Sequence, residues 1–113
     1  MIWVMNNWSL NLTSLNEYQV AARKYAVYKD PMYPVLALGE EAGEVLGKFA
    51  KANRKGVTPC PIEVAKELGD TLWQLSAIAA DLGFTLEQIA NMNLEKLQDR
   101  MNRSVLVGEG DNR

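Results

Sequence analysis

Residues 40–44 read Glu-Glu-Ala-Gly-Glu, and residues 67–70 read Glu-Leu-Gly-Asp. Within each segment, carboxylates three or four residues apart gather on one side of an α-helix. If the two helices pack against each other, these carboxylates converge and repel one another unless a cation lies between them. Because the chain has no histidine, the expected cation is one that prefers oxygen ligands, Mg²⁺ or Mn²⁺.

The signals along the rest of the chain predict helices and no strand. Residues 14–17 (Ser-Leu-Asn-Glu) and 85–88 (Thr-Leu-Glu-Gln) have the form of capping boxes, and Pro34 suits a first helical turn. Gly83 is placed to end a helix in the left-handed conformation. The predicted helices cover about 14–28, 34–54, 62–82 and 85–103, followed by an irregular tail at 104–113. We therefore predict an all-α antiparallel four-helix bundle.

The composition predicts one folded domain over residues 1–113, because 48% of the residues are hydrophobic and 23% are charged. The helices look apolar on more than one side, which predicts a homo-oligomer. A net charge of −2 without a basic block argues against nucleic acid and anionic membranes as partners. The apolar residues 1–5 are too few for a signal peptide or a membrane span. The single cysteine, Cys60, excludes an internal disulfide and fits a reducing cytoplasm.

The third predicted helix supports the idea of a cation site. One of its sides carries the polar residues Glu63, Glu67, Asp70, Gln74 and Asp81. Most of the remaining circumference is apolar, so this polar stripe is expected to be partly buried. Unpaired buried carboxylates are strongly destabilising, and a bound divalent ion removes that penalty. The alternative is a pair of solvated acidic faces, in which Glu44 and Lys48 form an ordinary stabilising pair.

The second predicted helix has a stripe of small residues, Gly39, Gly43 and Gly47. Each glycine inside a helix costs roughly 1 kcal/mol relative to alanine. The stripe therefore predicts the close approach of another backbone, and the alternative is that the helix simply tolerates these glycines.

Asn93, Lys96 and Arg100 line up on the fourth predicted helix and offer hydrogen-bond donors suited to phosphate oxygens. A solvated helix flank explains the same residues equally well. A second candidate group for phosphate consists of Lys48, Lys51, Arg54 and Lys55. One or two aromatic residues are candidates to stack on a nucleobase. The composition does not select among Trp3, Trp8, Tyr18, Tyr25, Tyr33 and Trp73.

The acidic pattern is also similar to a known family. Glu40-Glu41-x-x-Glu44, then 22 residues, then Glu67-x-x-Asp70, with Asn93-x-x-Lys96 downstream, resembles the MazG family of all-α nucleoside triphosphate pyrophosphohydrolases. Two segments are close to the sequence motifs of that family: Gly-Glu-Glu-Ala-Gly-Glu-Val at 39–45 and Lys-Glu-Leu-Gly-Asp at 66–70. The resemblance extends from about Asn16 to Arg103, and the short length is similar to stand-alone members, including phage-encoded ones.

The resemblance implies cleavage of nucleoside triphosphates, dNTPs in particular, between the α and β phosphates, to a monophosphate and pyrophosphate. It implies Mg²⁺, with Mn²⁺ as a substitute, and a homodimer or homotetramer in the cytoplasm of a bacterium or of a phage-infected host. By motif position, the implied metal ligands are Glu41, Glu44, Glu67 and Asp70. The resemblance also implies that Glu40 and Glu41 act in catalysis. Glu40 would orient or deprotonate the attacking water.

The remaining site residues are carried over in the same way. Asn93 and Lys96 are implied to hold phosphate or sugar oxygens, and Arg100 joins them from helical spacing alone. Asn16 and Gln19 are assigned to contacts with the base or the sugar. The alternative function is a non-catalytic helical interaction module. A carboxylate-bridged di-iron bundle is disfavoured, because that design usually needs histidine ligands.

Overall fold

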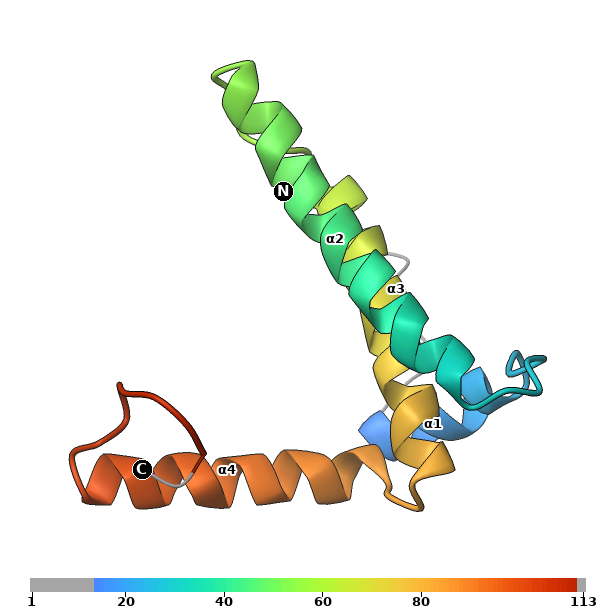
Figure 1. Cartoon of the computed structure of the whole chain (residues 1–113), viewed down its shortest axis with the longest axis vertical. Helices are drawn as coiled ribbons and strands as arrows, with labels where there is room; N and C mark the ends of the chain where they lie inside the picture. Colours follow the sequence, from blue (N-terminus) through green and yellow to red (C-terminus); the bar gives the residue numbers. More distant parts are fainter. Residues whose placement is uncertain (1–13, 112–113) are drawn as a thin grey trace.

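The structure is a computed structural model that describes residues 14–111. It contains the helices α1 (Leu15–Arg23), α2 (Met32–Arg54), α3 (Pro61–Asp81) and α4 (Leu86–Asn102) (Figure 1). No strand occurs within the described range, so the predicted all-α class is confirmed. Trp3, Trp8 and the apolar residues 1–5 lie outside the described residues.

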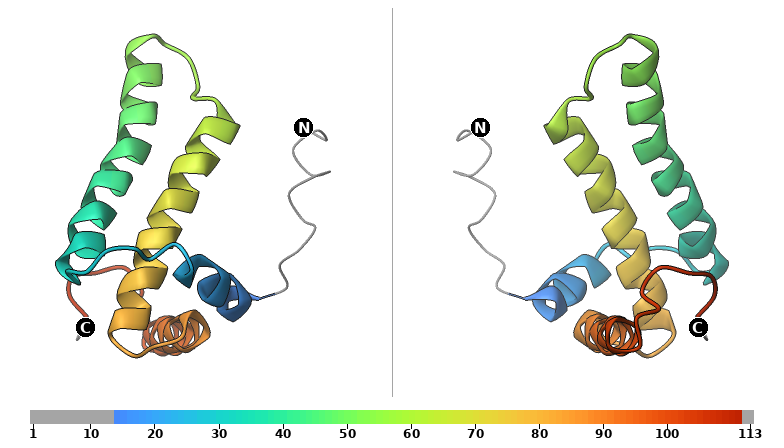
Figure 2. Two further views of the ribbon diagram at one scale, coloured as in Figure 1. Left: turned by 90° about the vertical axis from the view of Figure 1, so that its right-hand side faces the viewer. Right: turned by 90° about the vertical axis from the view of Figure 1, so that its left-hand side faces the viewer.

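The dominant packing unit is an antiparallel pair formed by α2 and α3. Figure 2 shows the two helices rising side by side from a base that contains α1 and the start of α4. Helix α1 packs against α3 and α4, whereas α4 leads away from the α2–α3 pair (Figure 1). The four helices are present, but a single chain leaves them in an open arrangement and does not close them around one core.

The helix ends follow the predicted local signals. Ser14 accepts a hydrogen bond from the backbone N–H of Glu17, and Thr85 and Gln88 form a reciprocal capping box at the start of α4. Gly83 follows α3 with a φ of 86°, in the left-handed region that L side chains rarely adopt. These local expectations are confirmed. Helix α2 begins at Met32, two residues before the predicted start at Pro34.

The first helix is shorter than predicted, because α1 ends at Arg23 and not near Tyr28. The side chains of Arg23 and Tyr28 both donate hydrogen bonds to Asp81 at the end of α3, and Arg23 also donates to the Tyr28 hydroxyl at 2.7 Å. In a continuous helix, five further residues would rotate Tyr28 by about 500°, which leaves it about 140° around the axis from Arg23. The two side chains could not then reach the same carboxylate, so the chain leaves the helix.

Two side chains of α1 fix it to the turn between α3 and α4. The Gln19 amide donates to the carbonyl oxygens of Ser76 and Phe84 at 3.3 and 3.0 Å, and accepts from the N–H of Leu86 at 3.0 Å. The Asn16 side chain accepts from the N–H of Glu87, whose carboxylate accepts from the N–H of Asn16, both at 3.0 Å. These bonds orient α1 across the base of the molecule.

Large apolar side chains remain exposed in a single chain. Leu46, Phe49 and Leu94 are 71%, 51% and 63% exposed. At Gly39, Gly43 and Gly47, no atom of a neighbouring element lies within 4 Å of the place that a Cβ would take. The predicted close approach of another backbone is therefore wrong for the described part of a single chain. No helix between residues 14 and 111 is both long and apolar enough to cross a bilayer.

Candidate metal centre

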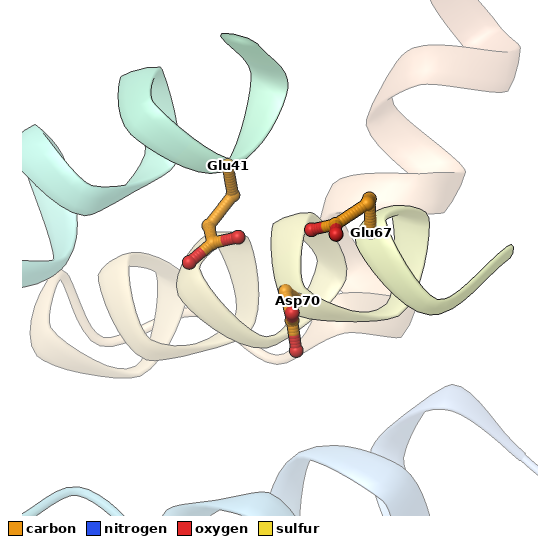
Figure 3. Close-up of side chains that lie close together, drawn as sticks. All are labelled: Glu41, Glu67 and Asp70. Carbon is orange, nitrogen blue, oxygen red and sulfur yellow. The ribbon is translucent and has the colours of Figure 1, made fainter. Parts of the chain in front are cut away.

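Three carboxylates from two helices meet near the middle of the α2–α3 pair. Glu41 comes from α2, and Glu67 and Asp70 come from α3. One oxygen of each can be chosen so that all three lie within 4.8 Å of one another. In Figure 3, Glu41 extends from α2 towards α3, and the Glu67 carboxylate points back towards it. The structure therefore brings together three of the four predicted metal ligands.

The local sequence explains this meeting. Glu67 and Asp70 are three residues apart, so they lie on one side of α3. Glu41 comes from the helix that runs antiparallel beside it (Figure 3). Glu41 and Glu67 are half-buried, whereas Asp70 is exposed towards α1. Side-by-side packing of α2 and α3 is thus sufficient to assemble the group.

The electrostatics of the group favour a cation. Burial raises the pKa of Glu41 above its ordinary value, and the charges of Asp70, Glu67, Glu44 and Glu40 raise it further. Within residues 14–111 no ion pair involves Glu41, Glu67 or Asp70, so no side chain of this range neutralises them. The donor set consists only of carboxylate oxygens, which is the ligand type that Mg²⁺ and Mn²⁺ prefer. The residues present therefore fit a hard divalent ion.

The remaining acids of α2 lie beside the group. Glu40 and Glu44 are exposed, and neither belongs to the set of oxygens that gather within 4.8 Å. Both are near enough to raise the pKa of Glu41. Their roles as catalyst and ligand stay predictions.

The polar stripe of α3 divides into parts with different surroundings. Its last acid, Asp81, accepts hydrogen bonds from Tyr28 and Arg23, which lower the pKa of its carboxyl group. Glu63, near the start of α3, is exposed. Only the middle of the stripe, Glu67 and Asp70, contributes to the three-carboxylate group.

The predicted phosphate-binding residues lie on another element. Asn93, Lys96 and Arg100 belong to α4, which leads away from the α2–α3 pair (Figure 1). One chain therefore does not place them alongside the carboxylates. Lys96 and Arg100 each bond to the carboxylate of Asp111 at 3.1 Å, and Arg100 is only 5% exposed. Their role in binding phosphate stays a prediction.

The two residues predicted to contact the base or sugar both have partners inside the protein. Gln19 is 8% exposed, and its amide bonds to three backbone groups. The Asn16 side chain caps α4 through the N–H of Glu87. A contact of Gln19 with a nucleotide would require one of these bonds to break, so the structure gives it a structural function.

A hollow beside the carboxylates could not be located from the sequence. A cavity of about 440 Å³ is lined by Asp70 together with Tyr18, Tyr25 and Trp73. Burial raises the pKa of the Tyr18 hydroxyl, and the nearby charge of Asp70 raises it further. The sequence indicates only that the chain contains several aromatic residues. The packing of α1 against α3 brings these three to the cavity.

Comparison with known proteins assigns the chain to a family. Residues 32–105, which include α2, α3 and α4, match the MazG nucleotide pyrophosphohydrolase domain. The chain is also similar to the Gene 37 protein of Mycobacterium phage L5, with 34% identity over 109 residues that cover 85% of this chain and 96% of the relative. No solved structure matches the chain. Since the family match covers more than half of the chain and contains all three clustered carboxylates, this protein is a member of the MazG nucleotide pyrophosphohydrolase family.

Proposed function

We propose that this protein hydrolyses nucleoside triphosphates, dNTPs in particular, between the α and β phosphates, and that the reaction depends on a divalent metal ion. The products are a nucleoside monophosphate and pyrophosphate. The observation that carries the proposal is the meeting of Glu41, Glu67 and Asp70 within 4.8 Å, in a chain of this family. Three carboxylates without a counter-cation are unfavourable for stability, so their convergence indicates a function.

In this proposal the acids of α2 and α3 hold Mg²⁺, with Mn²⁺ as a substitute. The residues that would hold the ion are Glu41, Glu44, Glu67 and Asp70. When bound, the ion supplies charge neutralisation for the phosphate oxygens, which dominates catalysis of phosphoryl transfer. Glu40 is exposed next to Glu41 and outside the gathered oxygens, so its carboxylate is free to orient or deprotonate the attacking water.

Asn93, Lys96 and Arg100 complete the proposed machinery by binding phosphate or sugar oxygens. Since α4 leads away from the carboxylates in one chain, we infer that the working site forms in an assembly of at least two copies. The exposed Leu46, Phe49 and Leu94 support such an assembly, because water-exposed apolar area of this kind is usually covered by a partner. We expect the assembly to act in the cytoplasm of a bacterium or of an infected host.

The assembly is tested by light scattering after size exclusion. Leu46→Glu on α2 should shift the wild-type homodimer or homotetramer towards monomer. Val107→Glu serves as the control, because Val107 is 95% exposed on the tail, away from the helix faces. A wild-type protein that is monomeric at micromolar concentration would remove this part of the proposal.

The activity is tested by incubating the purified protein with each NTP and dNTP, with and without Mg²⁺, and separating the products. We expect equal amounts of monophosphate and pyrophosphate, and no turnover after the metal is chelated. Orthophosphate as the only phosphate product would show cleavage at another bond. No turnover of any nucleotide, together with no thermal stabilisation by Mg²⁺, would favour the non-catalytic interaction module.

A further inference from the structure

The hollow beside Asp70 continues along α3. The cavity of about 440 Å³ at Asp70 shares Tyr25 and Trp73 with a second cavity of about 400 Å³, which Gln74 and Tyr28 also line. Because they share two lining residues, the cavities lie next to each other along α3, and we refer to the two together as the channel. Each volume is within the range of small-molecule sites.

Gln74, which lines the second cavity, has an unusual environment. It follows Asp70 by four residues, so it lies on the same side of α3. It is only 5% exposed, yet its amide has no hydrogen-bond partner in the part of the chain that the structure describes. The unpaired amide atoms are not fully enclosed, and the residue lines the second cavity. The small open part of Gln74 therefore includes its polar end.

Gln19 provides a comparison within the same molecule. It is buried to a similar degree, with 8% exposure, and bonds to three backbone groups. Buried amides are normally satisfied in this way, because an unpaired buried donor or acceptor is destabilising. The unpaired amide of Gln74 therefore points to a polar ligand that bonds to it from the cavity.

The cavity that Gln74 lines also has aromatic walls, and one of them is held in place by hydrogen bonds. The Tyr28 hydroxyl donates to Asp81 at 2.7 Å and accepts from Arg23 at 2.7 Å, so its polar atom is already used. The Tyr28 ring stacks on Tyr33 with ring centres 5.9 Å apart. A flat ligand with one polar edge suits this site, since Trp73 and Tyr25 offer stacking surfaces and Gln74 offers a donor next to an acceptor.

We propose that this channel binds the nucleobase of the substrate and that Gln74 recognises the edge of the base through paired hydrogen bonds. A primary amide can donate and accept at once, which matches the neighbouring donor and acceptor groups on base edges. Trp73 or Tyr25 supplies the stacking surface. The inference rests on the proposed function, because it places the base next to the carboxylates that would act on the phosphates.

The test replaces Gln74 with methionine, which keeps the length of the side chain and removes both hydrogen-bonding groups. We expect KM for dNTPs to rise about tenfold, the loss typical of one or two hydrogen bonds, with kcat within about twofold. The matched control is Gln98→Met on α4, where the side chain is exposed and bonds to Asn102. Circular dichroism melts of both variants verify folding.

Inorganic tripolyphosphate separates recognition of the base from a general effect on the site. It has the phosphates and no base, so its inhibition constant should be the same for Gln74→Met and the wild type. An equal weakening of tripolyphosphate and dNTPs would overturn the proposal, because Gln74 would then act on the phosphate end or on folding. An unchanged KM for every dNTP would overturn it as well.

A binding measurement keeps this inference distinct from the proposed activity. Isothermal titration with nucleoside monophosphates in the absence of metal needs no turnover. If the wild type hydrolyses nothing but binds monophosphates, and Gln74→Met weakens that binding about tenfold, the base site stands while the proposed activity fails. If the wild type is active and both proteins bind monophosphates equally, the base site fails alone.

Discussion

The carboxylate of Asp111 lies 3.1 Å from the guanidinium of Arg100, so the C-terminal segment folds back onto α4. The same carboxylate lies 3.1 Å from the Lys96 ammonium. Hydrogen bonds from Lys96 and Arg100 lower the pKa of Asp111 below its ordinary value, as expected when cations stabilise the charged carboxylate. A carboxylate of this chain therefore occupies the two cations that are predicted to hold phosphate.

The first prediction concerns competition at these cations. Asp111→Asn removes the negative charge and should lower KM for dNTPs about threefold, because Lys96 and Arg100 are then more available to phosphate. Steady-state kinetics at low ionic strength provide the measurement, since salt screens the exposed Asp111. Glu109→Gln is the control, as it removes a charge from the same tail. A KM that is unchanged or higher would show that the contact only holds the tail.

The second prediction concerns the repulsion at Glu41. Its raised pKa shows that its charged form is disfavoured, so Glu41→Gln should stabilise the metal-free protein by about 0.5 kcal/mol. The same substitution should abolish stabilisation by Mg²⁺ and lower activity by more than about a hundredfold, the upper end for residues that only orient ligands. Thermal melts with and without Mg²⁺ separate the two effects. If the metal-free variant melts below the wild type and still responds to Mg²⁺, Glu41 is not a ligand.

The third prediction tests the structural function of Gln19. Gln19→Leu leaves the carbonyl groups of Ser76 and Phe84 and the N–H of Leu86 without this partner. We expect the free energy of unfolding to fall by about 2–3 kcal/mol, since buried polar groups then lack hydrogen bonds. Urea unfolding gives the value, and Gln98→Leu is the control at an exposed position. A loss of nucleotide binding without a loss of stability would instead support the predicted contact with the base.

The parts of the fold that the sequence predicts well depend on near neighbours. Ser14 and Thr85 each accept a hydrogen bond from a backbone N–H three residues later, and Gly83 needs only its own backbone freedom. The early end of α1 depends on Asp81, which lies 58 residues from Arg23 in the chain. No local signal contains that partner, so periodicity extends the helix too far.

The candidate site shows the same difference between local signals and contacts with residues distant in the sequence. Spacing predicts that Glu67 and Asp70 share one side of a helix, and only the pairing of α2 with α3 adds Glu41. Spacing also places Gln74 on that side, but gives no indication that this buried residue has an amide without a partner among residues 14–111. That property depends on the packing of α1 and on the loop that Arg23 and Asp81 hold in place.

The last prediction concerns the pH dependence of the stability that comes from the hydrogen bonds of Tyr28 and Arg23 to Asp81. The hydrogen bond from Tyr28, and then that from Arg23, lower the pKa of Asp81 below its ordinary value of 3.8. The folded state therefore holds this proton less tightly than the unfolded state. The stabilisation is complete above pH 3.8 and is lost as the pH falls through the folded-state pKa.

Asp81→Asn should lower the free energy of unfolding by about 1 kcal/mol at pH 7, a modest value because solvent screens the half-exposed Arg23. Urea unfolding from pH 7 to pH 3 should show the gap between wild type and variant closing below pH 3.8. Asp99→Asn, at the exposed pair with Arg103, should leave the unfolding curves nearly unchanged. A gap of constant size at every pH would show that the Asp81 carboxylate stabilises the protein by packing and not by its charge.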